Sequence, residues 1–375
     1  MENTVKGTGI VCEYNPFHKG HAYQISKVKE MGADFVVCAM SGDFTQRAES
    51  AFQDKKIRAN NAVMNGADVV LEIPFPFSSL SAEGFARAGV SILENCGLCD
   101  SFAFGSECAD VEKLLTLSKI LTPSFHKEVI ALQKETPNLS YAKARELLIE
   151  RKLSREYADI ITNPNDILAT EYLKANKTLR PIAISRKTPR GGFDENFVSS
   201  SYIRKNLLSG TDEETAKRGL AENCSLEGIF ENDALFYQHM LVGLMMKEPE
   251  SLSDIAELQK GSEYSVVKNA RQAQSYQELC SLLSSKTVTD AKARRMALFS
   301  FFGVTKDMAK SVPLYTEVLA TSEKGRKMLK KFSDDRKMIV ASRVAEIKKD
   351  KDALSQYDFS RLASEVLKKC RGMTL

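Results

Sequence analysis

The feature that most limits how this chain can fold is the stretch 9–22, GIVCEYNPFHKGHA. Its short apolar run ends at an Asn-Pro pair, and the H-x-G-H pattern follows at once. Ile25 and Val28 then follow His21 at helical spacing. The stretch therefore predicts a strand, a tight turn and the start of a helix.

A helix start of this composition is suited to binding phosphate. The first N–H groups of a helix are unpaired and lie at the positive end of its dipole, so an anion is stabilised there. Gly20 lets a ligand approach the backbone, and His18 and His21 can donate hydrogen bonds to phosphate oxygens. Taken alone, the pattern is equally compatible with two ordinary loop histidines at a helix cap.

Four strand-like runs occur at intervals along the first part of the chain, beginning with the one described above. They cover residues 8–13, 34–40, 68–73 and 101–104, with segments between them that are long enough for helices. This spacing predicts β-α-β units and a parallel sheet, whose ligands bind beyond the carboxyl ends of the strands. Residues 180–186 are predicted to form the last strand of this sheet.

Three other segments are predicted to contribute to the site. The polar segment 41–58 follows the second strand and is expected to shape a pocket for the acceptor. The basic loop 186–192 contains two glycines that would allow it to fold over a nucleotide. The third segment is SSSYIR at 199–204, in which Ser200, Ser201 and Arg204 would form a second phosphate site at a helix start.

The remainder of the chain has a helical pattern and a basic end. We predict a catalytic domain at 1–225 and an all-helical domain at 226–375. Residues 291–375 carry 20 Lys and Arg against 10 Asp and Glu, although the whole chain has a net charge of only +4. Lys286, Lys292, Arg294 and Arg295 would form a surface for a polyanion such as RNA, or simply the solvated faces of helices.

Several classes of protein are disfavoured by what the sequence lacks. Neither G-x-G-x-x-G nor the P-loop pattern occurs, and no run of about 18 apolar residues predicts a membrane span. The eight cysteines are scattered, which argues against a disulfide framework. Cys96, Cys99 and Cys108 have no second ligand pair nearby, so we predict no metal bound by the protein. We expect a cytoplasmic protein that does not associate with membranes.

Five motifs in order resemble one known family. They are EYNPFHKGH at 13–21, MSG at 40–42, FGSE at 104–107, PNDIL at 164–168 and SSSYIR at 199–204. The H-x-G-H and Ser-rich Ile-Arg elements are typical of the HxGH nucleotidyltransferase superfamily. The full set, spread over most of the chain, resembles the bacterial tRNA(Met) cytidine acetate ligases. The resemblance implies a Rossmann-like α/β fold followed by a helical C-terminal domain.

The resemblance also implies an activity and a set of contacts. Members of this family use ATP and Mg²⁺ to activate acetate as acetyl-adenylate and transfer the acetyl group to the wobble cytidine of elongator tRNA(Met), forming N4-acetylcytidine. His18, His21 and Arg204 would be catalytic, and Lys286, Lys292, Arg294 and Arg295 would bind tRNA. The residues implied to contact ATP are Val11, Cys12, Glu13, Tyr14, Asn15, Pro16, Phe17, His18, Lys19, Gly20, His21, Ala22, Tyr23, Gln24, Gly105, Asn165, Arg186, Lys187, Ser200 and Ser201.

Two other functions remain compatible with the sequence. An adenylyltransferase of the same superfamily that makes a small cofactor would use the same sheet, but it would not need about 150 further residues. A relative that binds RNA without catalysis would not need the intact H-x-G-H and SSSYIR elements. Stabilisation of the protein by bound ATP would distinguish an enzyme from the non-catalytic relative that binds RNA.

Overall fold

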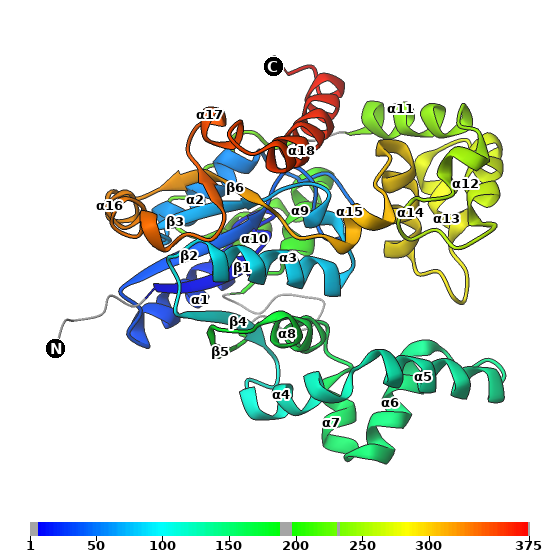
Figure 1. Cartoon of the computed structure of the whole chain (residues 1–375), viewed down its shortest axis with the longest axis horizontal. Coiled ribbons are helices and arrows are strands. Elements are labelled where there is room, and N and C mark those ends of the chain that lie inside the picture. The colour runs from blue at the N-terminus through cyan, green and yellow to red at the C-terminus, as the bar shows by residue number, and fades with distance from the viewer. Residues whose placement is uncertain (1–6, 188–196, 231–232, 374–375) are drawn as a thin grey trace.

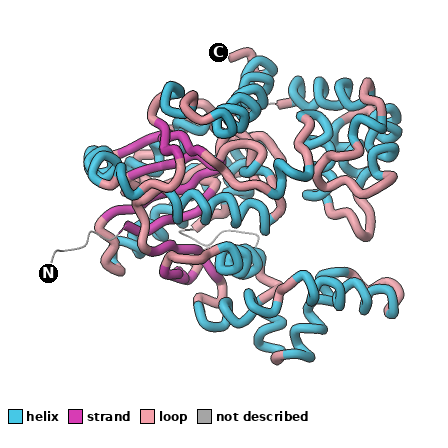
Figure 2. Tube along the Cα trace, in the orientation of Figure 1, coloured by secondary structure: helices cyan, strands magenta, loops and turns pink. Residues whose placement is uncertain are grey.

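One sheet organises the molecule (Figures 1 and 2). The computed structural model describes residues 7–187, 197–230 and 233–373. In these residues seven strands lie in the order β5-β4-β1-β2-β3-β6-β7, and all neighbours are parallel except β3 and β6. The strands are β1 Gly7–Cys12, β2 Phe35–Ser41, β3 Val69–Ile73, β4 Ser101–Ser106, β5 Arg180–Ser185, β6 Tyr315–Thr321 and β7 Ile339–Ala341. The predicted Rossmann-like α/β fold is confirmed.

Helices connect the strands, and some of these helices form two lobes beside the sheet. The helices up to β5 are α1 Lys19–Glu30, α2 Lys55–Met64, α3 Ala82–Asn95, α4 Val111–Ile120, α5 Pro123–Glu135, α6 Tyr141–Lys152, α7 Arg155–Ile160 and α8 Pro164–Ala175. Those that follow are α9 Ser200–Ser209, α10 Glu213–Gly219, α11 Ala234–Met245, α12 Ser262–Gln272, α13 Tyr276–Leu283, α14 Asp290–Phe302, α15 Lys306–Lys310, α16 Glu323–Lys331, α17 Val344–Ile347 and α18 Lys351–Cys370. Short 3-10 turns lie at Phe77–Ser79, Pro249–Leu252 and Ser333–Asp335. Helices α11–α14 gather in one lobe and α4–α7 in another (Figure 1).

The sheet is buried on both faces because successive side chains of a strand point to opposite sides. In β2, Val37 packs into a core that includes side chains of α3 and α8. Its neighbours Val36 and Cys38 pack with residues of α1 and α2 on the other face. This double burial explains why β2 is apolar at nearly every position rather than alternating.

The C-terminal part of the chain is mainly helical, but it is not all-helical as we predicted, because it also returns to the sheet. Strand β6 pairs antiparallel with β3, and β7 pairs with β6. Our prediction that residues 180–186 form the last strand was therefore wrong, although β5 itself lies where we placed it. Only two of the seven residues of β6 are both hydrophobic and buried, Tyr315 and Ala320, so its strand pattern is weak. Its position is set by the edge of β3, which it covers. The domain boundary at residue 226 stays a prediction.

The strand order locates the natural binding site. The chain runs outward from β1 through β2 and β3 in one direction and through β4 and β5 in the other, so the order reverses between β1 and β4. Ligands of open α/β sheets bind in the crevice at such a point. Within the described residues, no helix is long and apolar enough to cross a membrane. Residues 188–192 of the predicted basic loop lie outside the described residues.

Candidate active site

The H-x-G-H turn forms the start of α1 as the sequence predicts. His18 is the N-cap residue, and its Nδ1 accepts a hydrogen bond from the Gly20 N–H at 3.0 Å. The Nδ1 of His21 accepts from the His18 N–H at 3.3 Å. The two rings stack with centroids 3.6 Å apart and planes 17° apart. Because both Nδ1 atoms accept, a neutral ring carries its hydrogen on Nε2, and the turn presents two Nε2–H donors.

Both imidazoles are held in the neutral form. Burial, together with the positive charge of Arg186, lowers the pKa of His18 from 6.5 to about 3. Burial, the neighbouring His18 and Arg186 also lower the pKa of His21 well below its usual value. At neutral pH the pair therefore acts as two hydrogen-bond donors, and the positive charge at this place comes from Arg186.

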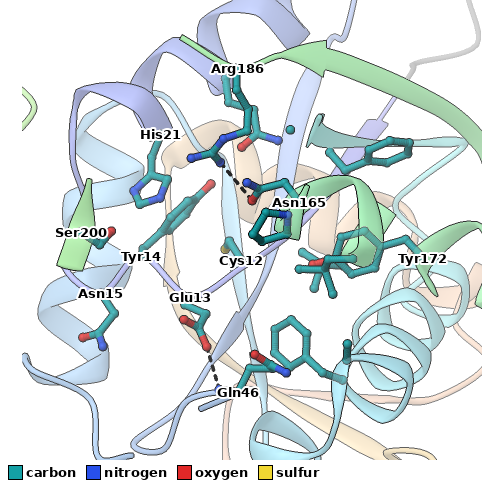
Figure 3. A pocket seen from close by; sticks show the side chains of 18 of the residues that line it. Cys12, Glu13, Tyr14, Asn15, His21, Gln46, Asn165, Tyr172, Arg186 and Ser200 are labelled. Carbon is teal, nitrogen blue, oxygen red and sulfur yellow. Dashed lines mark hydrogen bonds between the residues drawn. The ribbon is translucent and has the colours of Figure 1, made fainter. Parts of the chain in front are cut away.

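A cavity of about 340 Å³ lies at the carboxyl ends of β1 and β4, at the reversal of strand order (Figure 3). A smaller cavity of about 40 Å³ adjoins it and shares His21, Gln24, Gly105 and Arg186 with it. The residues of the predicted nucleotide site that line one or both cavities are Val11, Cys12, Glu13, Tyr14, Asn15, His18, Gly20, His21, Tyr23, Gln24, Gly105, Asn165, Arg186, Lys187 and Ser200. The fold thus brings together residues from five separate segments of the sequence.

The other predicted contacts have different surroundings. Pro16 and Phe17 are buried in the turn, and Ala22 packs against the apolar core under α1. Lys19 is half-buried at the first position of α1. Ser201 is exposed, and its hydroxyl accepts a hydrogen bond from Arg204 at 3.4 Å. These five residues are close in sequence to residues that line the two cavities, but they are not among the lining residues themselves.

Asn165 and Arg186 form a polar link across the cavity (Figure 3). The Arg186 guanidinium donates to the Asn165 side-chain oxygen at 3.2 Å, and the Asn165 amide donates to Glu107 at 2.6 Å. Asn163 is the N-cap residue of α8, and Pro164 is the first helical residue. Proline favours that first position, since no N–H is needed there. The Asn165 side chain is therefore available to the cavity.

Arg204 holds the turn rather than lining the cavity. Its guanidinium donates to the Asn15 carbonyl oxygen at 2.6 Å. It thereby joins the start of α9 to the end of β1, segments about 190 residues apart. Figure 3 shows Asn15 and Ser200 on the same side of the cavity. The geometry makes Arg204 a positioning residue, and a catalytic role for it stays a prediction.

Sequence reasoning missed most of the apolar wall of the cavity. Phe85 comes from α3, Phe104 from β4, and Leu168 and Tyr172 from α8. Such a wall suits the flat face of a nucleobase. Phe104 stands at the carboxyl end of a predicted strand, and Leu168 ends the PNDIL motif, so both had a signal in the sequence. The others come from helices, and their apolar spacing is indistinguishable from ordinary core packing.

The polar wall of the cavity comes from the 41–58 segment, where we expected the acceptor pocket. Gln46 and Arg47 line the cavity, and the Gln46 N–H donates to the Glu13 carboxylate at 2.7 Å. Arg58 fixes this segment. Its fully buried guanidinium donates to the backbone carbonyls of Glu13 at 2.6 Å and of Ser41 at 3.1 Å. One side chain thus ties the carboxyl ends of β1 and β2 together.

Asp166 is a second anchor that the sequence did not reveal. It is fully buried and accepts hydrogen bonds from the Ser106 hydroxyl at 2.5 Å and from the Glu107 N–H at 3.0 Å. It also accepts from the Asn163 amide at 2.9 Å. These contacts attach α8 to the end of β4, which sets the position of Asn165 and of the apolar wall.

The four cations predicted to contact tRNA have unequal surroundings. Lys286 is exposed and donates to the Asn138 side chain at 3.0 Å, and Lys292 is half-buried. Arg294 is half-buried and pairs with Glu49 at 3.3 Å. Arg295 is buried and pairs with Glu257 at 2.7 Å, so the prediction that it belongs to an exposed cationic surface was wrong. Its position on the inner side of α14 makes it part of the packing of the lobe.

Comparison with known proteins identifies the family. The family model described as HIGH Nucleotidyl Transferase matches residues 5–371. The tRNA(Met) cytidine acetate ligase of Lysinibacillus sphaericus is 32% identical, with 91% of this chain and 90% of that protein covered. The chain belongs to the tRNA(Met) cytidine acetate ligase family. The enzyme of the same name from Clostridium perfringens is 30% identical over 94% of this chain and 92% of its own length.

Solved structures support the same family assignment. The crystal structure of Thermotoga maritima TmcAL bound with alpha-thio ATP matches with a TM-score of 0.86 at 28% identity, covering 97% of this chain and 94% of that one. The apo form of the same protein matches with a TM-score of 0.88 at 29% identity, covering 97% and 95%. The chain therefore shares with this ligase family the sheet, the helical lobes and nearly the whole length.

Proposed function

We propose that this chain uses ATP to activate acetate as acetyl-adenylate and then transfers the acetyl group to the exocyclic amine of the wobble cytidine of elongator tRNA(Met). The observation that carries the proposal is the stacked pair of neutral histidines beside Arg186 at the start of α1. It gives a place where phosphate charge is stabilised by fixed donors. The named relatives, including one crystallised with an ATP analogue, support ATP as the substrate.

In the first step a carboxylate oxygen of acetate attacks the α-phosphate of ATP. A new P–O bond forms, the bond to the β-phosphate oxygen breaks, and pyrophosphate leaves. Catalysis of phosphoryl transfer is mainly positioning and charge stabilisation. The Nε2–H groups of His18 and His21 would donate to the phosphate oxygens as negative charge develops, and Arg186 would supply the positive charge. The apolar wall of Phe104 and Tyr172 would hold the adenine.

In the second step the cytidine amine attacks the acyl carbon of acetyl-adenylate. An N–C bond forms, AMP leaves as the C–O bond breaks, and the amine loses a proton. The base would have to leave its stack to reach the cavity. The 41–58 segment, with Gln46 and Arg47 on the cavity wall, would receive it. Lys286, Lys292 and the half-buried Arg294 would contact the RNA backbone.

We also propose that Mg²⁺ accompanies ATP. Among the described residues, no group of three or more His, Cys, Asp or Glu side chains is arranged to hold a metal ion. Glu13 is the carboxylate on the cavity wall. Mg²⁺ commonly binds through substrate phosphates and water with one or two carboxylates, which fits this donor set. When bound, it would neutralise phosphate charge. Since ATP and tRNA are cytoplasmic, we propose the cytoplasm as the site of action.

Acetate-dependent exchange of labelled pyrophosphate into ATP tests the first step. The wild-type protein should catalyse it, and His21→Ala should reduce the rate by about 100- to 1000-fold, the usual cost of losing one well-placed donor. His239→Ala, at an exposed position of α11, is the matched control. Full exchange in His21→Ala would remove His21 from the mechanism.

Mass spectrometry of nucleosides tests the second step. Transfer RNA incubated with the protein, ATP and acetate should yield N4-acetylcytidine at the wobble position of elongator tRNA(Met). Formate in place of acetate shows whether the acyl group is selected. Exchange without any modified cytidine would limit the activity to adenylate formation.

A further inference from the structure

A second large cavity lies between the 41–58 segment and the lobe of helices α11–α14. Its volume is about 520 Å³, within the range of ligand pockets in proteins. The residues that line it include Glu49 on one side, Tyr237 and Gln238 of α11, and Tyr276, Gln277 and Arg294 of α13 and α14. The two proposed reaction steps use Arg294 at its edge but assign no ligand to this cavity.

Two tyrosines give the cavity a flat aromatic component. The rings of Tyr237 and Tyr276 stack with centroids 4.4 Å apart and planes 12° apart. The Tyr237 hydroxyl shares a hydrogen bond of 3.2 Å with Ser50. The buried Tyr276 hydroxyl makes no hydrogen bond of normal geometry in the described part of the chain, although the weakly polar Cys280 thiol lies beside it. A buried hydroxyl without a partner costs free energy unless a ligand satisfies it.

Amide and guanidinium groups surround the aromatic pair. The side chains of Gln238 and Gln277 are exposed and line the cavity. Amides can both donate to and accept from the edge of a nucleobase, as the bases of single-stranded RNA require. Arg294 adds a planar cation that can stack on a base or contact a phosphate. This combination of an aromatic pair, amides and an arginine is typical of sites for unpaired bases.

The 41–58 segment links this cavity to the candidate active site. Arg47 lines the nucleotide cavity and Glu49, two residues later, lines this one. Two residues span at most about 7 Å, roughly the rise of two stacked nucleotides. Arg294 fixes the connection, because its Nε donates to the Arg47 carbonyl at 3.2 Å and lies 3.3 Å from the Glu49 carboxylate. A strand with one base in the active site can therefore place a neighbouring base here.

We infer that this cavity binds an unpaired base of the RNA loop, one or two nucleotides from the reacting cytidine. The inference rests on the proposed function, since it assumes that the cytidine reaches the cavity lined by Arg47. Binding of a second flipped base fixes the register of the loop, so the cavity selects which cytidine reacts. The backbone contacts of lysines supply affinity but no such register.

Binding of modified RNA hairpins tests the inference. The probe is the anticodon stem-loop of elongator tRNA(Met), together with a series in which each loop nucleotide except the wobble cytidine is made abasic in turn. One abasic hairpin should bind the wild-type protein about 5- to 150-fold more weakly than the intact probe, the range for a lost base–aromatic contact. The variant Tyr276→Leu should lose this difference, because it removes the stacking surface, and the double variant Gln238→Ala/Gln277→Ala should reduce it, because the base loses the contacts to its edge.

Matched substitutions outside the cavity serve as controls. Tyr264 is 55% exposed on α12, so Tyr264→Leu should keep the wild-type response, as should Gln272→Ala. Gln238 and Gln277 are exposed, so their variant answers the question even if Tyr276→Leu fails to fold. The inference is overturned if no abasic hairpin binds the wild type more weakly, or if the difference is as large in the glutamine variant as in the wild type.

The same preparations separate this inference from the proposed function. Acetate-dependent pyrophosphate exchange measures the nucleotide cavity without RNA. Absence of exchange in the wild-type protein would refute the proposed activation step, whereas the hairpin comparison would still decide whether a base binds between α11, α13 and α14. Wild-type exchange with an unchanged hairpin profile in the glutamine variant would refute only the base site.

Discussion

The buried state of His18 predicts a loss of stability in acid. In the unfolded chain this imidazole takes up a proton near pH 6.5, but in the folded chain its pKa is about 3, because it is buried and lies near Arg186. Between these values the unfolded state binds the proton and the folded state does not. The contribution of this group to the free energy of unfolding is therefore fully present above pH 6.5, and it is lost as the pH decreases toward 3.

The magnitude follows from the two pKa values. Their difference, 6.5 minus about 3, corresponds to a total loss of roughly 5 kcal/mol, which is reached only below about pH 3, where the folded state is protonated as well. At pH 5 the loss relative to pH 7 is about 2 kcal/mol. His21 shifts in the same direction, so it adds to the loss rather than cancelling it.

His18→Asn isolates the effect. Asparagine is also a favoured N-cap residue and can accept from the Gly20 N–H, but it does not titrate. Urea unfolding at pH 7 and pH 5 should show that the variant loses about 2 kcal/mol less than the wild type over this interval. His239→Asn, which alters an exposed histidine, should lose as much as the wild type.

Equal acid sensitivity of His18→Asn and the wild type would refute the reasoning. It would mean that His18 takes up a proton in the folded state, and the pair could then not act as neutral donors at mildly acidic pH. A change in the denaturant dependence of the free energy of unfolding would have to be excluded first, since it would signal altered two-state behaviour.

Three further predictions follow from other contacts. Arg58→Met should lower the free energy of unfolding by about 3 kcal/mol or more in urea titrations, because the carbonyls of Glu13 and Ser41 lose their buried donor; a loss below about 1 kcal/mol would contradict this anchoring role. Gly105→Val should weaken ATP binding in thermal-shift titrations while the free protein stays folded, since a Cβ there lies 3.4 Å from Arg186, an ordinary contact, and occupies space on the cavity wall; unchanged ATP affinity would place the nucleotide elsewhere. Lys286→Glu should weaken binding of tRNA and reduce the salt dependence by about one charge without affecting unfolding, and an unchanged salt dependence would remove Lys286 from the RNA interface.

The sequence determined the features that depend on local chemistry. The Asn-Pro break and the H-x-G-H pattern fix a turn followed by a helix start, and the structure has α1 beginning at Lys19 with His18 as its cap. Apolar runs of four to seven residues between helix-length segments identified the five strands β1–β5 within one or two residues. These features could be predicted because strand and helix periodicity, capping and turn residues act over a few positions.

Only the tertiary structure decided the features that arise from contacts between distant segments. Arg295 was predicted to be exposed, but the packing of α14 turns it inward toward Glu257. The anchoring roles of Arg58 and Asp166 depend on carbonyl and N–H groups that other strands bring to them. Strand β6 forms because β3 offers an unpaired edge. A sequence records which groups can form hydrogen bonds, but their partners are set by the free energy of packing the whole chain, to which every segment contributes.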